Sequence, residues 1–136
     1  MRKINKVLIG IGIVALIILV AKYYYILGFL LEPIEPLRFS IHNSDINKHT
    51  VTVEIFDSYN KSLFKETYIV NPREPIFSPE ITKKKGEYNF KVNLDGNIEK
   101  IYNAKTDIGR SGVSIWLYDE KVSGSKDPLY IVQAIA

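Results

Sequence analysis

An uninterrupted apolar run near the start of the chain limits most strongly what this sequence can become. Val7 to Ala21 contains only valine, leucine, isoleucine, alanine and glycine. A helix rises about 1.5 Å per residue, so Val7 to Tyr25 spans roughly 28 Å, close to the hydrocarbon thickness of a bilayer. A helix also satisfies its own backbone hydrogen bonds, as a segment in hydrocarbon must. We therefore predict a transmembrane helix with an interfacial tail over residues 7–31, in which Ile26 to Leu31 extends the helix or lies in the interface.

The residues on either side of this run indicate its orientation. Residues 1–6 hold three cations and no acidic residue: Arg2, Lys3 and Lys6. This bias favours a short basic N-terminus in the cytoplasm. Four residues at the far end suit a membrane interface, because their stems or rings are apolar and their tips are polar: Lys22, Tyr23, Tyr24 and Tyr25. The predicted location is the cytoplasmic membrane, with a single span and the C-terminal domain outside.

A cleaved signal peptide is the alternative to a retained anchor, since it also has a basic start and an apolar core. Cleavage after Ala21 would put Leu19 where a small residue is preferred, and would leave an apolar new N-terminus. The retained anchor is therefore favoured. A helix buried in a soluble core is disfavoured because the run has no polar face.

The rest of the chain is long enough for one domain. Two prolines in residues 32–36 predict a short, semi-rigid stalk, followed by an ectodomain over residues 37–136. Four of the 18 basic and two of the 15 acidic residues precede Leu37, which leaves 14 basic and 13 acidic residues in the domain. A nearly neutral domain does not favour nucleic acid as a partner. The absence of cysteine excludes disulfides, thiolate metal sites and a cysteine nucleophile.

Beyond the stalk, apolar and polar residues alternate, which is typical of half-buried strands. Strands are expected over residues 37–42, 50–55, 63–70, 81–83, 86–94, 98–103, 113–118 and 129–135. The last is apolar on both faces, as for a central strand. Three prolines make residues 71–80 a loop between sheets, with Ile76 and Phe77 turned inward. No helical period follows Leu31. We therefore predict an all-β head, an antiparallel β-sandwich of about seven or eight strands.

The order of these segments resembles that of small archaeal membrane-anchored surface proteins with an immunoglobulin-like or cupredoxin-like sandwich ectodomain. The similarity covers residues 39–118, and includes the strand at 49–55, the Gly86-to-Val92 strand and the Asp95-Gly96 turn. Gly86-Glu87-Tyr88 looks like the start of the sixth strand of an immunoglobulin-like domain, where the tyrosine packs at a corner. The resemblance implies an immunoglobulin-like fold and an outside location. Copper sites of cupredoxin type need a cysteine, so no copper or other cofactor is expected.

The candidate metal ligands are His42, Asp45 and His49, which flank one turn. We favour no metal, with both histidines on outward faces. A second candidate site is aromatic: Trp116, Tyr118 and Tyr130 form a binding surface or belong to the core, and the core is favoured. Asn60 begins an Asn-Lys-Ser glycosylation sequon at an expected hairpin tip.

The sequence contains no catalytic motif that we can defend. Asp95, Glu99, Asp107 and Asp119 show no paired arrangement for acid–base chemistry, and the glycines around Arg110 have the wrong spacing for a nucleophile elbow. The favoured hypothesis is a non-enzymatic single-pass membrane protein whose extracytoplasmic sandwich binds a protein partner, as an accessory or structural subunit of a membrane or cell-surface complex. The first alternative is a pilin- or archaellum-like filament subunit or filament accessory protein. The second is a solute- or metal-binding domain of a transport system.

Overall fold

The computed structural model describes residues 2–31, 34–107, 112–124 and 126–134. The chain forms two compact units, Met1–Pro33 and Ile34–Ala136, and each is described by itself.

The first unit is one helix, α1, which runs from Arg2 to Leu30 and has no buried residue. Its 29 residues correspond to about 43 Å of helix. The helix continues through Lys22 to Leu30, so residues 26–30 are part of the helix and not a separate segment after it. It is long and apolar enough to cross a membrane, and its length, composition and N-terminal position also fit a signal sequence.

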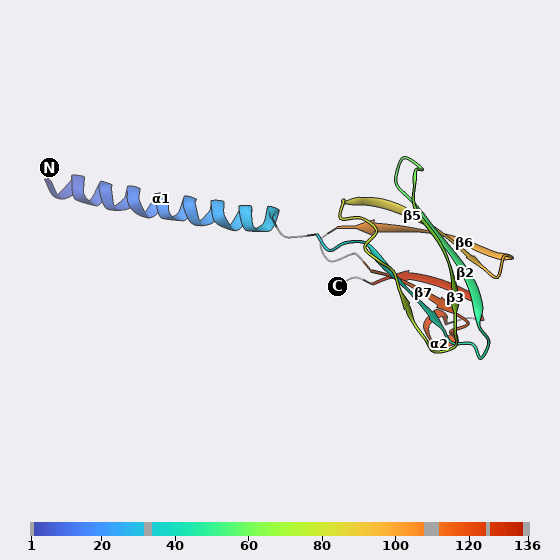
Figure 1. Cartoon of the computed structure of the whole chain (residues 1–136). Helices are drawn as coiled ribbons and strands as arrows, with labels where there is room; N and C mark the ends of the chain where they lie inside the picture. Colours follow the sequence, from blue (N-terminus) through green and yellow to red (C-terminus); the bar gives the residue numbers. More distant parts are fainter. Residues whose placement is uncertain (1, 32–33, 108–111, 125, 135–136) are drawn as a thin grey trace. The chain divides into compact units, whose positions relative to one another are not determined.

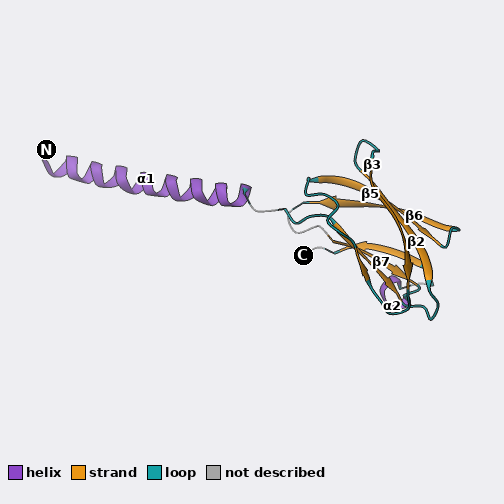
Figure 2. Ribbon diagram, viewed as in Figure 1, coloured by secondary structure: helices purple, strands orange, loops and turns teal. Residues whose placement is uncertain are grey.

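The second unit, the head, contains eight strands in two four-stranded sheets, in the orders β3-β2-β5-β6 and β4-β1-β7-β8 (Figure 1). The strands are β1 (Arg38–Asn43), β2 (His49–Phe56), β3 (Ser62–Val70), β4 (Ile76–Phe77), β5 (Gly86–Leu94), β6 (Ile98–Thr106), β7 (Gly112–Leu117) and β8 (Leu129–Gln133). A short helix, α2 (Glu120–Ser123), lies among the loops at one end of the head (Figure 2). The prediction of a mostly β, sandwich-like head after an apolar helix is confirmed.

Alternate residues of both sheets build one core between the layers. The largest fully buried side chains are Phe90, Leu37, Ile41, Ile55, Leu94, Ile115, Leu117, Leu129, Val51, Val53, Val70 and Val92. Phe39 joins the sheets, with edge-to-face contacts to Phe64, Tyr68 and Phe90 at centroid distances of 5.6 to 6.1 Å. The alternation follows from the pleat, which sends successive side chains to opposite faces of a strand.

Two expectations about strand pairing were wrong. The sandwich is not wholly antiparallel, because β1 and β7 pair in parallel from Arg38 opposite Gly112 to Asn43 opposite Leu117. The strand near the C-terminus, β8, lies at a sheet edge rather than at the centre. Its inner side closes the sandwich against β6, where Gln133 N donates to the hydroxyl of Tyr102 at 3.1 Å, and its apolar residues Tyr130 and Val132 lie on the outer face of the sheet.

Three local predictions also need correction. Residues 76–77 pair with β1 as β4 rather than lying in a loop: Ile76 packs against the core as expected, whereas Phe77 is 72% exposed because its register partner Ser40 faces outward. Strand β6 extends to Thr106, beyond the predicted end at Asn103. The predicted loop after β7 contains α2, because Asp119 caps its N-terminus by accepting from two backbone N–H groups and Gly124 ends it at φ 65°.

Candidate functional site

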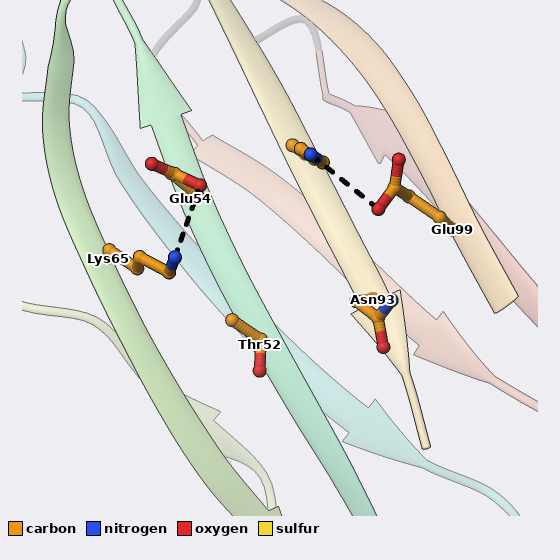
Figure 3. A pocket seen from close by; sticks show the side chains of 6 residues that line it. Thr52, Glu54, Lys65, Asn93 and Glu99 are labelled. Carbon is orange, nitrogen blue, oxygen red and sulfur yellow. Dashed lines mark ion pairs between the residues drawn. The ribbon is translucent and has the colours of Figure 1, made fainter. Parts of the chain in front are cut away.

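The outer faces of the two sheets differ in character, which narrows the search for a binding site. On the outer face of β3-β2-β5-β6, Lys65 pairs with Glu54 at 3.8 Å and Lys91 with Glu99 at 3.7 Å (Figure 3). With Thr52 and Asn93, these residues line an open depression of about 210 Å³. Charges that alternate in sign across neighbouring strands stabilise each other and remain hydrated. We interpret this surface, the charged face, as a solvated exterior.

The outer face of β4-β1-β7-β8 carries rings instead, and we call it the aromatic face. It is made of Phe77, Ser40, His42, Ser114, Trp116, Tyr130 and Val132. His42 and Trp116 are opposite each other in register and their rings stack, with centroids 4.2 Å apart and planes at 15°. Phe77 meets His42 edge-on at 6.5 Å, and Tyr130 is the register partner of Trp116 on its other side. Rings from four strands therefore lie next to one another across the sheet.

The expectation that Trp116, Tyr118 and Tyr130 belong mostly to the core was wrong. Trp116 and Tyr130 are half-buried on the outside, and Tyr118 is 41% exposed. The reason is parity along β7, in which Ile115 and Leu117 fill the core and the residue between them must face outward. The strict alternation of residues 113–117 was the signal that could have placed Trp116 outside.

His42 is held in a fixed orientation within the aromatic face. Its Nε2 lies 2.9 Å from Oγ of Ser40, which in turn donates to Oγ of Ser114 at 3.5 Å. Partial burial lowers the pKa of His42, and the charge of Asp119 opposes this without reversing it. The imidazole is therefore neutral at neutral pH. Nucleophilic catalysis would need a third group to orient the base, and no described residue hydrogen-bonds Nδ1 of His42.

One end of the aromatic face is hollowed by a depression of about 250 Å³. It is lined by His42, Asn43, Ser44, Arg73, Pro75 and Trp116. Asn43 is 3% exposed, and its amide donates to the carbonyls of Asn47 and Val70, which fixes the β1–β2 loop against the end of β3. Arg73 adopts φ 60° and donates its backbone N–H to the Asn43 carbonyl at 3.0 Å.

Next to this depression, His49 lies between two carboxylates. Its Nε2 is 2.6 Å from Oδ2 of Asp45, and its Nδ1 is 2.6 Å from Oδ2 of Asp95. The ring stacks on Tyr118 with centroids 4.8 Å apart, and the side chain is only 11% exposed. Partial burial lowers the pKa of His49, but the hydrogen bonds and charges of the two aspartates outweigh it, so the pKa is raised above 6.5.

The candidate metal ligands do not converge. His42 stacks on Trp116 on the outside, whereas His49 shares the parity of the buried Val51 and lies on the inner side of β2. The expectation that both histidines face outward was therefore wrong for His49. Within the described residues, no group of three or more histidine, cysteine or acidic side chains could hold a metal ion. The sequence reasoning missed Asp95 as a partner of His49, because the residues are 46 positions apart and only the β2–β5 pairing brings them together.

The remaining sequence candidates lie at accessible positions. Asn60 is exposed in the turn between β2 and β3, at φ 62°, and its glycosylation stays a prediction. Lys22 and the tyrosines that follow it are exposed on α1. Tyr23 and Tyr24 make an edge-to-face contact at 6.1 Å.

Comparison with known proteins adds no functional assignment: no protein-family model and no curated protein sequence matches this chain. The class defined by the structure is a two-sheet, sandwich-like β head preceded by an apolar helix long enough to span a membrane.

Proposed function

We propose that the protein is a non-enzymatic, single-pass membrane protein whose head binds a protein partner outside the cytoplasmic membrane, as an accessory or structural subunit of a membrane or cell-surface complex. The observation that carries the proposal is the aromatic face, where a phenylalanine that is 72% exposed meets a stacked histidine and tryptophan. Exposed clusters of large apolar side chains on a soluble domain mark interaction sites more often than not.

The composition of this face supports a protein partner. The centres of protein–protein interfaces are enriched in aromatic residues and depleted of charged ones. Tryptophan and tyrosine are also the residues whose truncation weakens interfaces most. Trp116, Tyr130 and Phe77 fit this pattern, and the only strand cation at the margin, Arg38, is paired with Glu80 at 2.8 Å. The stacked rings of His42 and Trp116 are in contact with each other, so they offer a partner a continuous apolar surface.

The immunoglobulin-like character of the head is also part of the proposal. It is supported by Tyr88, whose hydroxyl donates to the carbonyl of Lys84 at 2.8 Å, four residues upstream and just before β5. This matches the tyrosine corner of immunoglobulin-like domains. The parallel β1–β7 pair and the added strand β8 are departures from their seven-strand arrangement. The archaeal relationship rests only on the order of the sequence segments.

The proposed topology rests on the flanks of α1. The cations at Arg2, Lys3 and Lys6 support an N-terminus inside, and the tyrosines at the other end suit the outer interface. On this view the helix is retained, because a head released by cleavage would begin with the apolar tail of α1 and would expose it to water.

Site-specific photo-cross-linking in native membranes tests the proposal. A photoreactive phenylalanine analogue replaces Phe77 on the aromatic face, and in a matched control it replaces Tyr59, which is 92% exposed in the β2–β3 turn. We expect one defined protein adduct from position 77 and none from position 59, with a lower yield after Trp116→Ala. Absence of an adduct at position 77, or equal adducts at both positions, would contradict the proposal. An adduct with a second copy of this chain would instead favour the filament alternative.

A further inference from the structure

We propose that the depression lined by His42, Arg73 and Trp116 receives a carboxylate carried by an apolar or aromatic segment of the partner. This inference rests on the proposed function and names the chemistry that the partner must present. The depression lies at one end of the aromatic face, so a partner seated on the rings reaches it directly.

Arg73 supplies the positive charge. Among the described residues its guanidinium has neither a hydrogen bond nor an ion pair, whereas Arg38 on the same side of the head is already bound to Glu80. A guanidinium offers a planar fork of donors that matches the two oxygens of a carboxylate. Its backbone is held at φ 60° by the bond to Asn43, a conformation that is uncommon for a residue with a side chain. The fold thus fixes the backbone of Arg73 at the rim of the depression, and its exposed side chain is available to a ligand.

The other residues that line the depression indicate what kind of group should carry the carboxylate. Trp116 and Pro75 are apolar, His42 is neutral at neutral pH, and Asn43 and Ser44 are uncharged. A carboxylate attached to a ring or an aliphatic chain satisfies Arg73 and the apolar walls together. A small hydrated anion would satisfy only the cation.

Nearby acidic groups limit the charge that the depression can accept. Ser44 donates to a carboxylate oxygen of Asp119 at 2.8 Å, and the carboxylate of Glu74 accepts from the amide of Asn71 at 3.1 Å. These two negative charges disfavour a doubly charged phosphate, which would also require more than one free cation. A monovalent carboxylate is therefore favoured over a phosphate group.

Fluorescence of Trp116 tests the inference directly, because it is the only tryptophan in the chain. The purified full-length protein in detergent micelles is titrated with 3-phenylpropionate, and separately with 3-phenylpropionamide, which keeps the ring and lacks the charge. We expect a saturable change in Trp116 emission, at concentrations roughly fivefold lower for the carboxylate than for the amide, as one exposed charge-assisted contact provides.

Variants of Arg73 test whether its charge causes the preference for the carboxylate probe over the amide. Arg73→Gln should remove the difference between the two probes, and Arg73→Lys should retain part of it. Lys65→Gln removes one positive charge from the charged face and should change nothing. Equal binding of both probes, no binding of either, or a preference that survives Arg73→Gln would overturn the inference. A carboxylate preference without a cross-link at position 77 would support the carboxylate site and contradict the proposed function. A cross-link at position 77 without a carboxylate preference would support the proposed function and overturn the carboxylate site.

Discussion

Nδ1 of His49 lies 2.6 Å from Oδ2 of Asp95, and this contact joins the start of β2 to the turn between β5 and β6. The other ring nitrogen lies at the same distance from Asp45. A neutral imidazole has only one N–H and can donate to only one carboxylate. The two contacts together therefore require a protonated ring, which links the β1–β2 loop, β2 and the β5–β6 turn through one positive charge.

The stability of the head should depend on pH through this ring. The pKa of His49 is raised above 6.5, so its contribution is complete below pH 6.5 and is lost as the pH rises through the higher folded value. The hydrogen bond from His49 holds the pKa of Asp45 below 3.8. Burial raises that of Asp95, but the bonds from Thr50 and His49 outweigh it. The aspartates therefore contribute above pH 3.8 and lose their contribution on acidification.

Urea unfolding across this pH range checks the prediction, with loss of β circular dichroism as the signal for the head. We expect His49→Gln to lower the free energy of unfolding near pH 6, because the two charge-assisted contacts are lost. The loss should be only about 1 kcal/mol, since both carboxylates remain open to water. The difference between wild type and variant should shrink as the pH rises. A difference that is constant from pH 6 to 9 would show that His49 is not protonated in the folded head.

The tyrosine hydroxyl at the start of β5 should stabilise the head measurably. Tyr88 is 4% exposed, and its hydroxyl bond to the Lys84 carbonyl fixes the segment that leads into β5. Tyr88→Phe keeps the ring and should lower the free energy of unfolding by about 1 kcal/mol. Tyr59→Phe, at a residue that is 92% exposed, should have no effect in the same denaturation experiment. Equal stabilities of the two variants would argue that the Tyr88 bond has no structural role.

Substitution of two neighbouring residues of β7 should separate stability from binding: the buried residue should affect mainly stability, and the outer residue mainly partner binding. Ile115 is fully buried, so Ile115→Ala should reduce the free energy of unfolding by about 2 to 5 kcal/mol. Trp116 packs on the outside, mainly against His42, and Trp116→Ala should cost roughly 1 kcal/mol while weakening capture of a partner through position 77. Thermal unfolding separates the two variants. A loss from Trp116→Ala as large as that from Ile115→Ala would place the indole in the core.

The absence of cysteine makes the topology accessible to a clean labelling experiment. Tyr59→Cys places a thiol at an exposed turn of the head, and Asn5→Cys places one before the apolar run. A membrane-impermeant maleimide should label the first variant on intact cells, and the second only after permeabilisation. Labelling of position 5 on intact cells would reverse the proposed orientation. Loss of residues 1–21 from the mature protein, measured by intact mass, would favour a signal peptide.

The local patterns that are visible in the sequence are those that the backbone period alone determines. The apolar run from Val7 to Ala21 predicts a helix, because a helix can place apolar side chains in lipid while all its backbone hydrogen bonds stay within the segment. Alternation around Val53 and Val92 predicts strands whose apolar face is inside, and both residues are fully buried. The Asp95-Gly96 turn joins β5 to β6, with Gly96 at the φ of 76° that glycine adopts easily.

Tertiary structure alone decided which strands became neighbours and therefore which side chains met. The parallel alignment of β1 with β7 places His42 opposite Trp116, although 74 positions separate them, and β2–β5 pairing brings Asp95 to His49. Neither pairing has a local signature, because the free energy of joining distant strands comes from burying a shared core rather than from the residues that happen to face outward. Local residue patterns are enough to predict the apolar helix and the strands, whereas the packing of the two sheets assembles the aromatic face, the contacts of His49 with two aspartates and the depression beside Arg73.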